Sequence, residues 1–144
     1  KRARRARRTL AARGLVEAVT WSFLPRAVAA QFGGGSDALE LANPISADLS
    51  SMRPSLLPGL LMGAARNANR GFADVALFEL GQAYSGDRPA DQMLNAAGVR
   101  AGTAALPGSG RHWDGATRDV NLFDAKADAV AVLAALGIDA GKAQ

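Results

Sequence analysis

Three runs between residues 43 and 84 decide the fold: NPIS at 43–46, SMRPSLLPGLL at 51–61 and VALFELGQAY at 75–84. The middle run begins a predicted helix over residues 55–70. Ser55 can cap the first backbone N–H groups of this helix. Pro58 lies in its first turn, where a missing N–H does no harm. The sequence therefore fixes where the helix starts.

The same helix carries an apolar stripe and a clear end. The stripe residues recur at helical spacing and are Leu56, Leu57, Leu60, Leu61, Ala64, Ala65 and Ala68. Arg66 and Arg70 suit the negative end of the helix dipole, and Gly71 can adopt the left-handed conformation that ends a helix. Burial of four leucines would contribute about 6 to 12 kcal/mol, at about 1.5 to 3 kcal/mol each. We therefore expect this helix to form the centre of the core.

The run from Val75 to Leu80 is apolar on both faces except for Glu79. Such a run is typical of a central strand that is covered on both sides. A glutamate in a buried strand must be paired or hydrogen-bonded. We expect a structural ion pair, with Arg53 or Arg70 as the partner, in preference to a general acid or base.

The motifs in these elements resemble a known family. NPIS at 43–46, MR-x-SLLPGLL at 52–61, Asn67-x-x-Arg70 and LFE-x-G at 77–81 are similar to the beta subunit of bacterial phenylalanyl-tRNA synthetase. Two more blocks also match in the family's order: GLVEAVTWSF at 14–23 lies before these motifs, and VNLFDAKAD at 120–128 lies after them. The departures from the family pattern are conservative or leave the helix intact, and they are Leu15, Trp21, Asn121, Ala125 and Ala127.

The resemblance covers the chain from Gly14 to Gly137 and implies the catalytic-like module of that subunit. This module is similar in fold to the class II synthetase catalytic domain, but it lacks the catalytic residues. The resemblance implies no catalytic, cofactor-binding or metal-binding residue here. The motif residues to which it assigns a structural role are Asn43, Pro44, Arg53, Ser55, Leu56, Leu57, Pro58, Phe78, Glu79, Gly81, Phe123, Asp124 and Lys126.

Patterns elsewhere in the chain predict the remaining elements. We expect helices over 2–13, 25–32 and 122–136, strands over 16–23, 38–42 and 92–102, a turn at 33–36, and loops at 85–91 and 104–110, the last one mobile. The expected apolar stripe of the last helix is Phe123, Ala127, Val130, Leu133 and Ala134, and Gly137 ends it. The predicted fold class is α+β. Its antiparallel β-sheet contains 16–23, 75–84 and 92–101, flanked by the 55–70 and 122–136 helices.

Length and composition favour one soluble domain. The chain has 144 residues, of which 49% are hydrophobic, and no apolar run approaches the roughly 20 residues that cross a bilayer. It lacks cysteine, an initiator Met and a signal-peptide pattern, so we expect a cytoplasmic piece of a longer protein. We divide it into a basic helix at 1–13, a core at 14–137 and a tail at 138–144.

The positive charge is concentrated at the N-terminus. Seven of the first thirteen residues are cationic, whereas the other residues carry ten positive and thirteen negative charges, a net −3. A basic helix of this kind could grip phosphates. The favoured interpretation is a solvated helix whose arginines meet acids in missing or partner segments.

Other candidate chemistry in the chain is weak. His112 has no second His or Cys at ligand spacing, so a metal site is not expected. The glycines at 33–35 lack the Lys-Ser/Thr of a phosphate-binding loop. Arg53 could clamp a phosphate, but a structural role at a strand–helix junction is favoured. In active class II domains an arginine follows the strand that corresponds to 75–84. Here Ser85-Gly86-Asp87 follow, and Arg88 lies past that position.

Three functions compete. The leading one is a non-catalytic structural module that packs against the catalytic alpha subunit of phenylalanine–tRNA ligase. The resemblance implies an alpha2beta2 complex, with ATP, Mg²⁺ and tRNA(Phe) used by the whole enzyme. The alternative is a nucleic-acid-binding module that acts through the arginine-rich N-terminus. A free-standing small enzyme is the third, and it lacks any nucleophile–base constellation.

Overall fold

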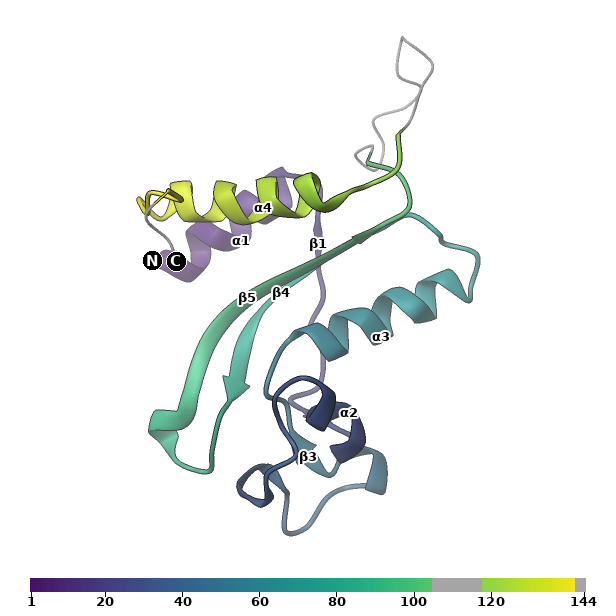
Figure 1. The fold of residues 1–144 in the computed structure, drawn as a ribbon, viewed down its shortest axis with the longest axis vertical. Helices are drawn as coiled ribbons and strands as arrows, with labels where there is room; N and C mark the ends of the chain where they lie inside the picture. Colours follow the sequence, from purple (N-terminus) through teal and green to yellow (C-terminus); the bar gives the residue numbers. More distant parts are fainter. Residues whose placement is uncertain (105–117, 142–144) are drawn as a thin grey trace.

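The computed structural model describes residues 1–104 and 118–141. Its elements follow one another in the order α1 (Arg2–Ala12), β1 (Val16–Glu17), β2 (Phe23–Leu24), α2 (Arg26–Gln31), β3 (Ser51–Met52), α3 (Leu57–Ala68), β4 (Val75–Tyr84), β5 (Gln92–Ala101) and α4 (Leu122–Ala135). Short 3₁₀ turns lie at Asp37–Leu39, Ala47–Leu49 and Pro89–Asp91. Figure 1 shows a long twisted hairpin of β4 and β5, with helices packed on either side of it.

The hairpin confirms the two long strands that the sequence predicts. β4 and β5 pair in antiparallel fashion over their whole length, from Val75 opposite Ala101 to Tyr84 opposite Gln92. β4 is the central strand of the sheet, in the order β1-β4-β5. The expected loop at 85–91 closes the hairpin, with Ser85 N–H donating to the Asp91 carbonyl at 3.0 Å. The predicted α+β fold is thus present.

The strand predicted over residues 16–23 is wrong in length and direction. Only Val16 and Glu17 pair with β4, and they do so in parallel, so the sheet is mixed. Residues 18–22 are irregular, and Phe23–Leu24 pair instead with β3 in a separate two-stranded sheet. The strand predicted over 38–42 is also wrong, because a 3₁₀ turn and one isolated bridge from Glu40 to Ser51 occupy that region. The alternation of side chains along residues 16–23 does not show that the chain passes from one sheet to another within this segment.

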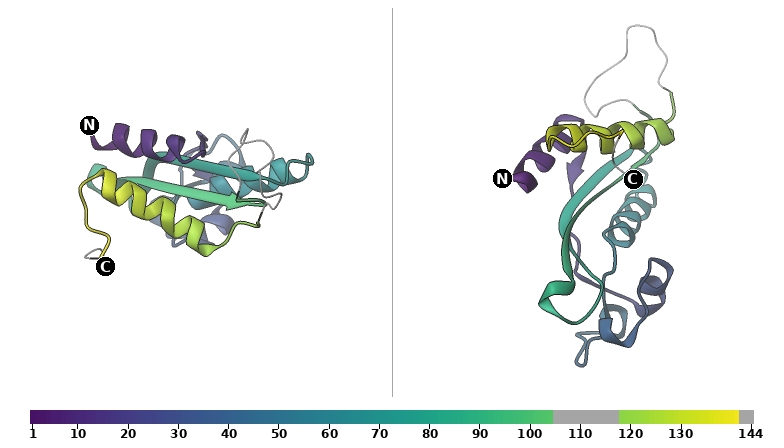
Figure 2. Two further views of the ribbon diagram at one scale, coloured as in Figure 1. Left: turned by 90° about the horizontal axis from the view of Figure 1, so that it is seen from above. Right: turned by 60° about the vertical axis from the view of Figure 1, so that its left-hand side comes forward.

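The side chains of β4 alternate between two layers of helices. Phe78 and Leu80 point to one face, where they join Ala6 and Leu10 of α1 in the core cluster. Leu77 points to the other face, where its side chain lies against α3 at Gly63. Figures 1 and 2 show α1 and α4 side by side across one end of the hairpin, with α3 on the other side.

The core is not centred where the sequence places it. Its cluster consists of Ala6, Leu10, Leu15, Phe78 and Leu80, under α1. The α3 stripe is only half buried, because Leu56 and Leu60 are enclosed while Leu57 and Leu61 are 39% and 44% exposed. Spacing shows which leucines share a side of a helix, but the neighbouring elements decide how wide a face they cover. The basic helix α1 is therefore a core element as well as a charged surface.

The stripe predicted for α4 is also wrong. Phe123 is 69% exposed and Val130 is 37% exposed, whereas the buried residue of α4 is Asp128. The helix itself is confirmed, with Asn121 as its N-cap and Gly137 in the left-handed region at φ +78°. The helix predicted from Pro25 is confirmed as α2, and its N-cap is Pro25. The predicted loop at 104–110 lies outside the described residues after Ala104, as does His112.

Candidate functional site

A buried ion pair lies where three of the motif runs meet. Arg53 Nη1 is 2.8 Å from Glu79 Oε1, and the two residues are 4% and 3% exposed. Thr20 Oγ1 donates to Glu79 Oε2 at 2.7 Å and accepts from Arg53 Nη1 at 3.0 Å. Arg53 Nε donates to the carbonyl of Gln82 at 2.8 Å. This network confirms the sequence prediction of a structural ion pair for Glu79 and selects Arg53 over Arg70.

The backbone of Arg53 fixes this residue at a junction of strands. Its N–H donates to the Ser22 carbonyl at 2.9 Å, and its carbonyl accepts from Tyr84 N–H at 3.0 Å. The guanidinium group consequently reaches Glu79 across the face of β4 that α3 covers. Two elements far apart in sequence are thereby joined through one arginine. Arg53 lies just before α3, and its side chain donates to Glu79, to Thr20 and to backbone carbonyls of the same chain.

Two glycines leave room for this network. A Cβ at Gly81 would meet Arg53 Nη2 and would lie 3.1 Å from Glu79 Oε1. A Cβ at Gly59 would meet the Thr20 side chain, with Thr20 Cβ at 2.9 Å. A larger residue at Gly81 would displace the ion pair itself, and one at Gly59 would displace Thr20, which hydrogen-bonds to both charged partners. The glycines of the LFE-x-G and LLPGLL runs are therefore explained by the close approach of side chains, which is a second use of glycine besides turns.

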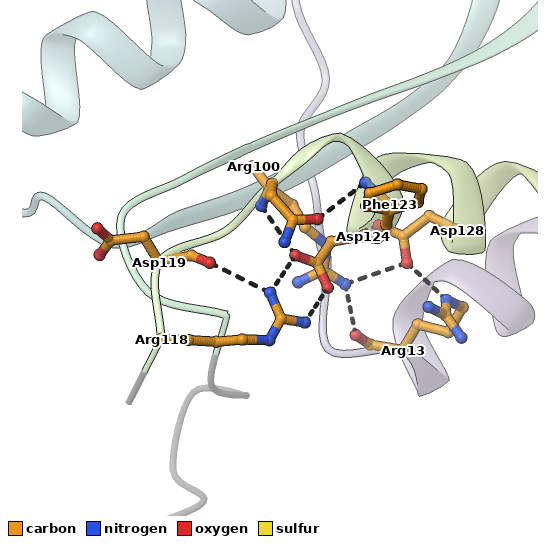
Figure 3. A network of polar contacts seen from close by, with 8 residues as sticks. Arg13, Arg100, Arg118, Asp119, Phe123, Asp124 and Asp128 are labelled. Carbon is orange, nitrogen blue, oxygen red and sulfur yellow. Dashed lines mark hydrogen bonds and ion pairs between the residues drawn. The ribbon is translucent and has the colours of Figure 1, made fainter. Parts of the chain in front are cut away.

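A second ion-pair network joins α1, β5 and α4 (Figure 3). Asp128 Oδ1 accepts from Arg13 Nε at 2.5 Å, and its Oδ2 accepts from Arg100 Nε at 2.6 Å. Arg100 Nη2 also donates to the backbone carbonyl of Arg13 at 2.9 Å. Burial raises the pKa of Asp128, but the hydrogen bonds from Arg100 and Arg13 outweigh it, so this pKa lies below its ordinary value.

The start of α4 is stabilised by a third, exposed group of contacts. Asn121 Oδ1 accepts from Phe123 N–H at 2.9 Å, and Asp124 Oδ2 accepts from Asn121 N–H at 2.9 Å, which together form a capping box. Arg118 makes a two-pronged contact with Asp124 at 2.7 and 2.6 Å. The hydrogen bonds from Arg118 and Asn121 hold the pKa of Asp124 well below its usual range.

The end of the hairpin is a tight, self-contained turn. Ser85 Oγ donates to the Asp91 carbonyl at 3.2 Å, and Arg88 N–H donates to Asp91 Oδ2 at 3.2 Å. Arg88 itself is exposed. Among the described residues, no salt bridge to the Arg88 side chain is present. The turn is therefore held by hydrogen bonds between its own residues.

The motif residues named from the sequence fall into two groups. One group lies around the Arg53–Glu79 pair and at the start of α3, with Phe78 on the opposite face of β4 in the core cluster: Arg53, Ser55, Leu56, Pro58, Phe78, Glu79 and Gly81. The other group is dispersed. Asn43, Pro44, Leu57, Phe123 and Lys126 are exposed, and Asp124 lies at the start of α4. The prediction that Ser55 caps the helix is wrong, because the N-cap of α3 is Leu56 and no side chain caps it; Ser55 Oγ still accepts from Leu57 N–H at 3.2 Å.

Four residues of the two buried networks were not singled out from the sequence. They are Arg13, Thr20, Arg100 and Asp128. Asp128 carries the best signal, because it lies four residues after Asp124, on one side of an otherwise apolar helix. Arg100 is the one charged residue of β5, and a partly buried cation needs a partner. Neither signal identifies which arginine meets which carboxylate.

Two hollows lie beside these networks. The first, about 400 Å³, is partly open to solvent and lies between α1, β5 and α4, and Leu10, Leu15, Val132 and Leu133 are among its lining residues. The second, about 470 Å³, lies between the segment 19–25 and α3, and Trp21, Met62 and Arg66 contribute to its wall. Neither wall includes a nucleophile paired with a base, since the lining residues are mostly aliphatic or aromatic.

Within residues 1–104 and 118–141, no group of three or more His, Cys, Asp or Glu residues is placed to hold a metal ion. No helix in the same ranges is long and apolar enough to cross a membrane.

Comparison with known sequences gives consistent matches over the chain. The family described as the phenylalanyl tRNA synthetase beta chain CLM domain matches residues 1–144. The phenylalanine–tRNA ligase beta subunit of Bradyrhizobium diazoefficiens is 62% identical over 136 residues, covering 94% of this chain and 17% of the relative. That of Nitrobacter winogradskyi is 62% identical over 143 residues, covering 99% and 18%. The chain spans less than a fifth of the length of these relatives.

Comparison with solved structures identifies the fold. A pyrrolysyl tRNA synthetase from Desulfitobacterium hafniense superposes with a TM-score of 0.60 at 20% identity, covering 96% of this chain and 45% of that one. A second structure of the enzyme from this organism gives a TM-score of 0.61 at 20% identity, with 95% and 46% covered. The likeness at this level of identity concerns the fold alone. It agrees with the α+β fold of class II synthetase type that the sequence predicts.

Proposed function

The chain belongs to the family of the phenylalanyl tRNA synthetase beta chain CLM domain, and we propose that it is a non-catalytic structural module of phenylalanine–tRNA ligase. Its partner is the alpha subunit, against which the module packs. The ATP and phenylalanine sites belong to that subunit. The matched relatives are named as beta subunits of the ligase, which supports membership in the enzyme rather than a separate activity.

The observation that carries the proposal is the closure of the Arg53–Glu79 network. Both charged groups are almost fully buried, and each is satisfied by the other, by Thr20 or by a backbone carbonyl. Within the described residues, no buried side-chain nitrogen or oxygen lacks a partner. A catalytic group has to be available to substrate, and these groups are committed to holding β4 to the segment before β2. Their role is to maintain the fold.

The end of the hairpin supports the same conclusion. Formation of an aminoacyl adenylate shifts negative charge toward the leaving pyrophosphate, so a cation has to be positioned there. The chain has Ser85, Gly86 and Asp87 directly after β4. Arg88 follows, and it is exposed. We therefore expect no useful ATP affinity, and titration calorimetry that measured micromolar ATP binding would contradict this expectation.

For the whole enzyme we propose an alpha2beta2 complex in the cytoplasm that joins phenylalanine to tRNA(Phe). ATP and Mg²⁺ act in the alpha subunit. The chain spans 17% to 18% of the matched beta subunits, so most of the subunit's own contacts lie in other segments. The contribution of this module is to present a folded surface to those segments and to the partner.

Capture of the alpha subunit tests the proposal directly. The immobilised chain is mixed with a purified phenylalanine–tRNA ligase alpha subunit, and binding is followed by surface plasmon resonance. The matched control is Leu60→Asp, which introduces a charge at a fully enclosed position and removes the fold. We expect the wild-type chain to bind and the control not to. Absence of wild-type binding, together with pyrophosphate release by the chain alone, would replace the proposal with an enzymatic function.

The structure gives no added support to nucleic-acid binding through α1. The helix does not stand free, because Ala6 and Leu10 on one of its sides belong to the core cluster. Arg7 and Arg13 pair with Glu17 and Asp128 of the same chain. These two arginines meet acids of this chain, whereas the sequence interpretation placed the acids in missing or partner segments.

A further inference from the structure

α4 is attached to the rest of the molecule in an unusual way. The buried residue of this helix is Asp128, and Val132 is the α4 residue that packs against the core cluster. Its largest apolar side chains, Leu122 and Phe123, are 71% and 69% exposed. No apolar side chain of α4 is fully buried, so apolar burial holds this helix less firmly than a closed core would.

The apolar surfaces that face each other beneath α4 are separated by a hollow of about 400 Å³. Leu10 and Leu15 line it from the α1 side, Val99 from β5, and Val132 and Leu133 from α4. Protein interiors are close-packed, and a gap of this size forfeits the dispersion contacts of its lining. The side of α4 that faces β5 is therefore only loosely packed.

Charge compensates for the missing packing. Asp128 joins α4 to the end of α1 through Arg13 and to β5 through Arg100, at 2.5 and 2.6 Å. The Asp128 and Arg100 side chains are each 10% exposed, and that of Arg13 is 35% exposed. Figure 3 shows the carboxylate between the two guanidinium groups. One carboxylate therefore connects three elements at the rim of the hollow.

We propose that Asp128 is an ionic anchor that makes α4 a separately releasable cover over the hollow. Loss of the anchor frees α4 and uncovers the apolar lining, while the hairpin and α3 stay folded. They stay folded because the Arg53–Glu79 network and the enclosed Leu56 and Leu60 hold them independently. The equilibrium between the covered and uncovered states is set by this one carboxylate and its two arginines.

Hydrogen exchange measured by mass spectrometry tests the anchor. In the Asp128→Asn chain we expect amide exchange in α4 to accelerate roughly a hundredfold, because two cations lose their carboxylate. Exchange in β4 should stay within about threefold of wild type. Lys126→Gln is the matched control, since Lys126 is an exposed charge on the same helix. The control should leave exchange unchanged in both elements.

The other outcomes overturn the proposal. Equal acceleration in α4 and β4 would show that α4 unfolds with the core, and unchanged exchange in both would show that the anchor is dispensable. If Asp128→Asn fails to fold, then α4 is part of the core and the proposal is also wrong.

Arg13→Gln provides a milder second test, because it removes one arm of the anchor and leaves Arg100 in place. We expect a roughly tenfold acceleration confined to α4. A dye that fluoresces on apolar surfaces should also bind the Asp128→Asn chain and not the Lys126→Gln chain. Absence of dye binding by Asp128→Asn would show that the hollow stays covered, which overturns the release of α4.

Discussion

The two ion-pair networks of this molecule use the same chemistry in opposite surroundings. Arg53 and Glu79 lie between β4 and the junction of β3 and α3, next to Leu56 and with almost no exposed surface. Asp128 lies at the edge of a hollow, with one of its two arginines partly exposed. The first network is enclosed by packing, and the second substitutes for packing.

The difference shows that an ion pair has no fixed value for stability. Attraction between charges grows as water is excluded, but so does the cost of removing the charges from water. A fully enclosed pair is therefore most damaging when one partner is lost, because the other cannot return to water. A pair at an edge loses less, since water can reach the stranded group. The loss of stability on breaking an ion pair should therefore increase with the burial of the pair.

The largest effect is expected from Glu79→Ala, which leaves the Arg53 cation buried without its carboxylate. We expect a loss of about 3 to 5 kcal/mol in the free energy of unfolding, measured by urea denaturation. The double variant Arg53→Met with Glu79→Met removes both charges and should be more stable than Glu79→Ala. A double variant less stable than the single one would show that the contacts of Arg53 with Thr20 and the Gln82 carbonyl matter more than charge.

The next largest effect is expected from truncation of a buried leucine on α3, near the Arg53–Glu79 network. Leu60→Ala should cost about 2 to 5 kcal/mol, because Leu60 is fully enclosed and its removal creates a cavity. Leu57→Ala, at a position that is 39% exposed, should cost about 1 kcal/mol or less. Chemical denaturation of the two variants measures the contrast. Equal losses would restore the fully buried leucine stripe that the sequence alone suggests.

The second network should respond to acid. Arg13 at the end of α1 and Arg100 of β5 are the cations that pair with Asp128, and Asp124, which pairs with Arg118, lies one turn earlier on α4. The pKa of Asp128 is lowered in the folded chain, so its contribution to stability is present above the unfolded value of about 3.9 and is lost as pH falls below it.

We expect the difference in unfolding free energy between wild type and Asp128→Asn to be about 1 to 3 kcal/mol at pH 7 and to shrink below pH 4. Urea denaturation at a series of pH values measures this difference. A constant difference from pH 7 to pH 2 would show that the carboxylate is not what holds α4. Asp128→Asn should therefore lose less stability at pH 7 than Glu79→Ala does.

The smallest effect is expected at the exposed pair of Arg7 and Glu17, whose side chains are 45% and 32% exposed. Arg7→Ala should cost less than about 1 kcal/mol, and added salt should reduce the cost further. Thermal denaturation at low and high salt measures it. A loss as large as that of Glu79→Ala would show that the degree of burial does not rank these pairs.

The sequence predicts the long elements well, since the motifs and periods that define them are local. The strands at 75–84 and 92–101 and the helices near both ends of the chain are present with small shifts at their ends. It also predicts that Glu79 needs a cation and names Arg53 as a candidate. An apolar strand cannot hold a bare carboxylate, so this demand is visible without a structure.

The failures share one physical cause. Alternation over 16–23 is a local pattern, but pairing is decided by which strand lies opposite, so residues 16–17 join β4 and residues 23–24 join β3. The α4 stripe is apolar and periodic, yet the helix turns Asp128 inward because Arg13 and Arg100 are there. Charge-assisted hydrogen bonds from two arginines on other elements hold this carboxylate inward, and a local apolar pattern cannot reveal them.

By itself, the sequence determined the family, the α+β class, the ends of the main helices and the need of Glu79 for an ion pair. Each of these depends on neighbours along the chain, where spacing and residue type are sufficient. Only the tertiary structure decided that the core lies under α1, that Gly59 and Gly81 make room for the Arg53 network, and that Asp128 anchors α4. These depend on residues up to 115 positions apart, and the distance between such residues is set by packing rather than by sequence order.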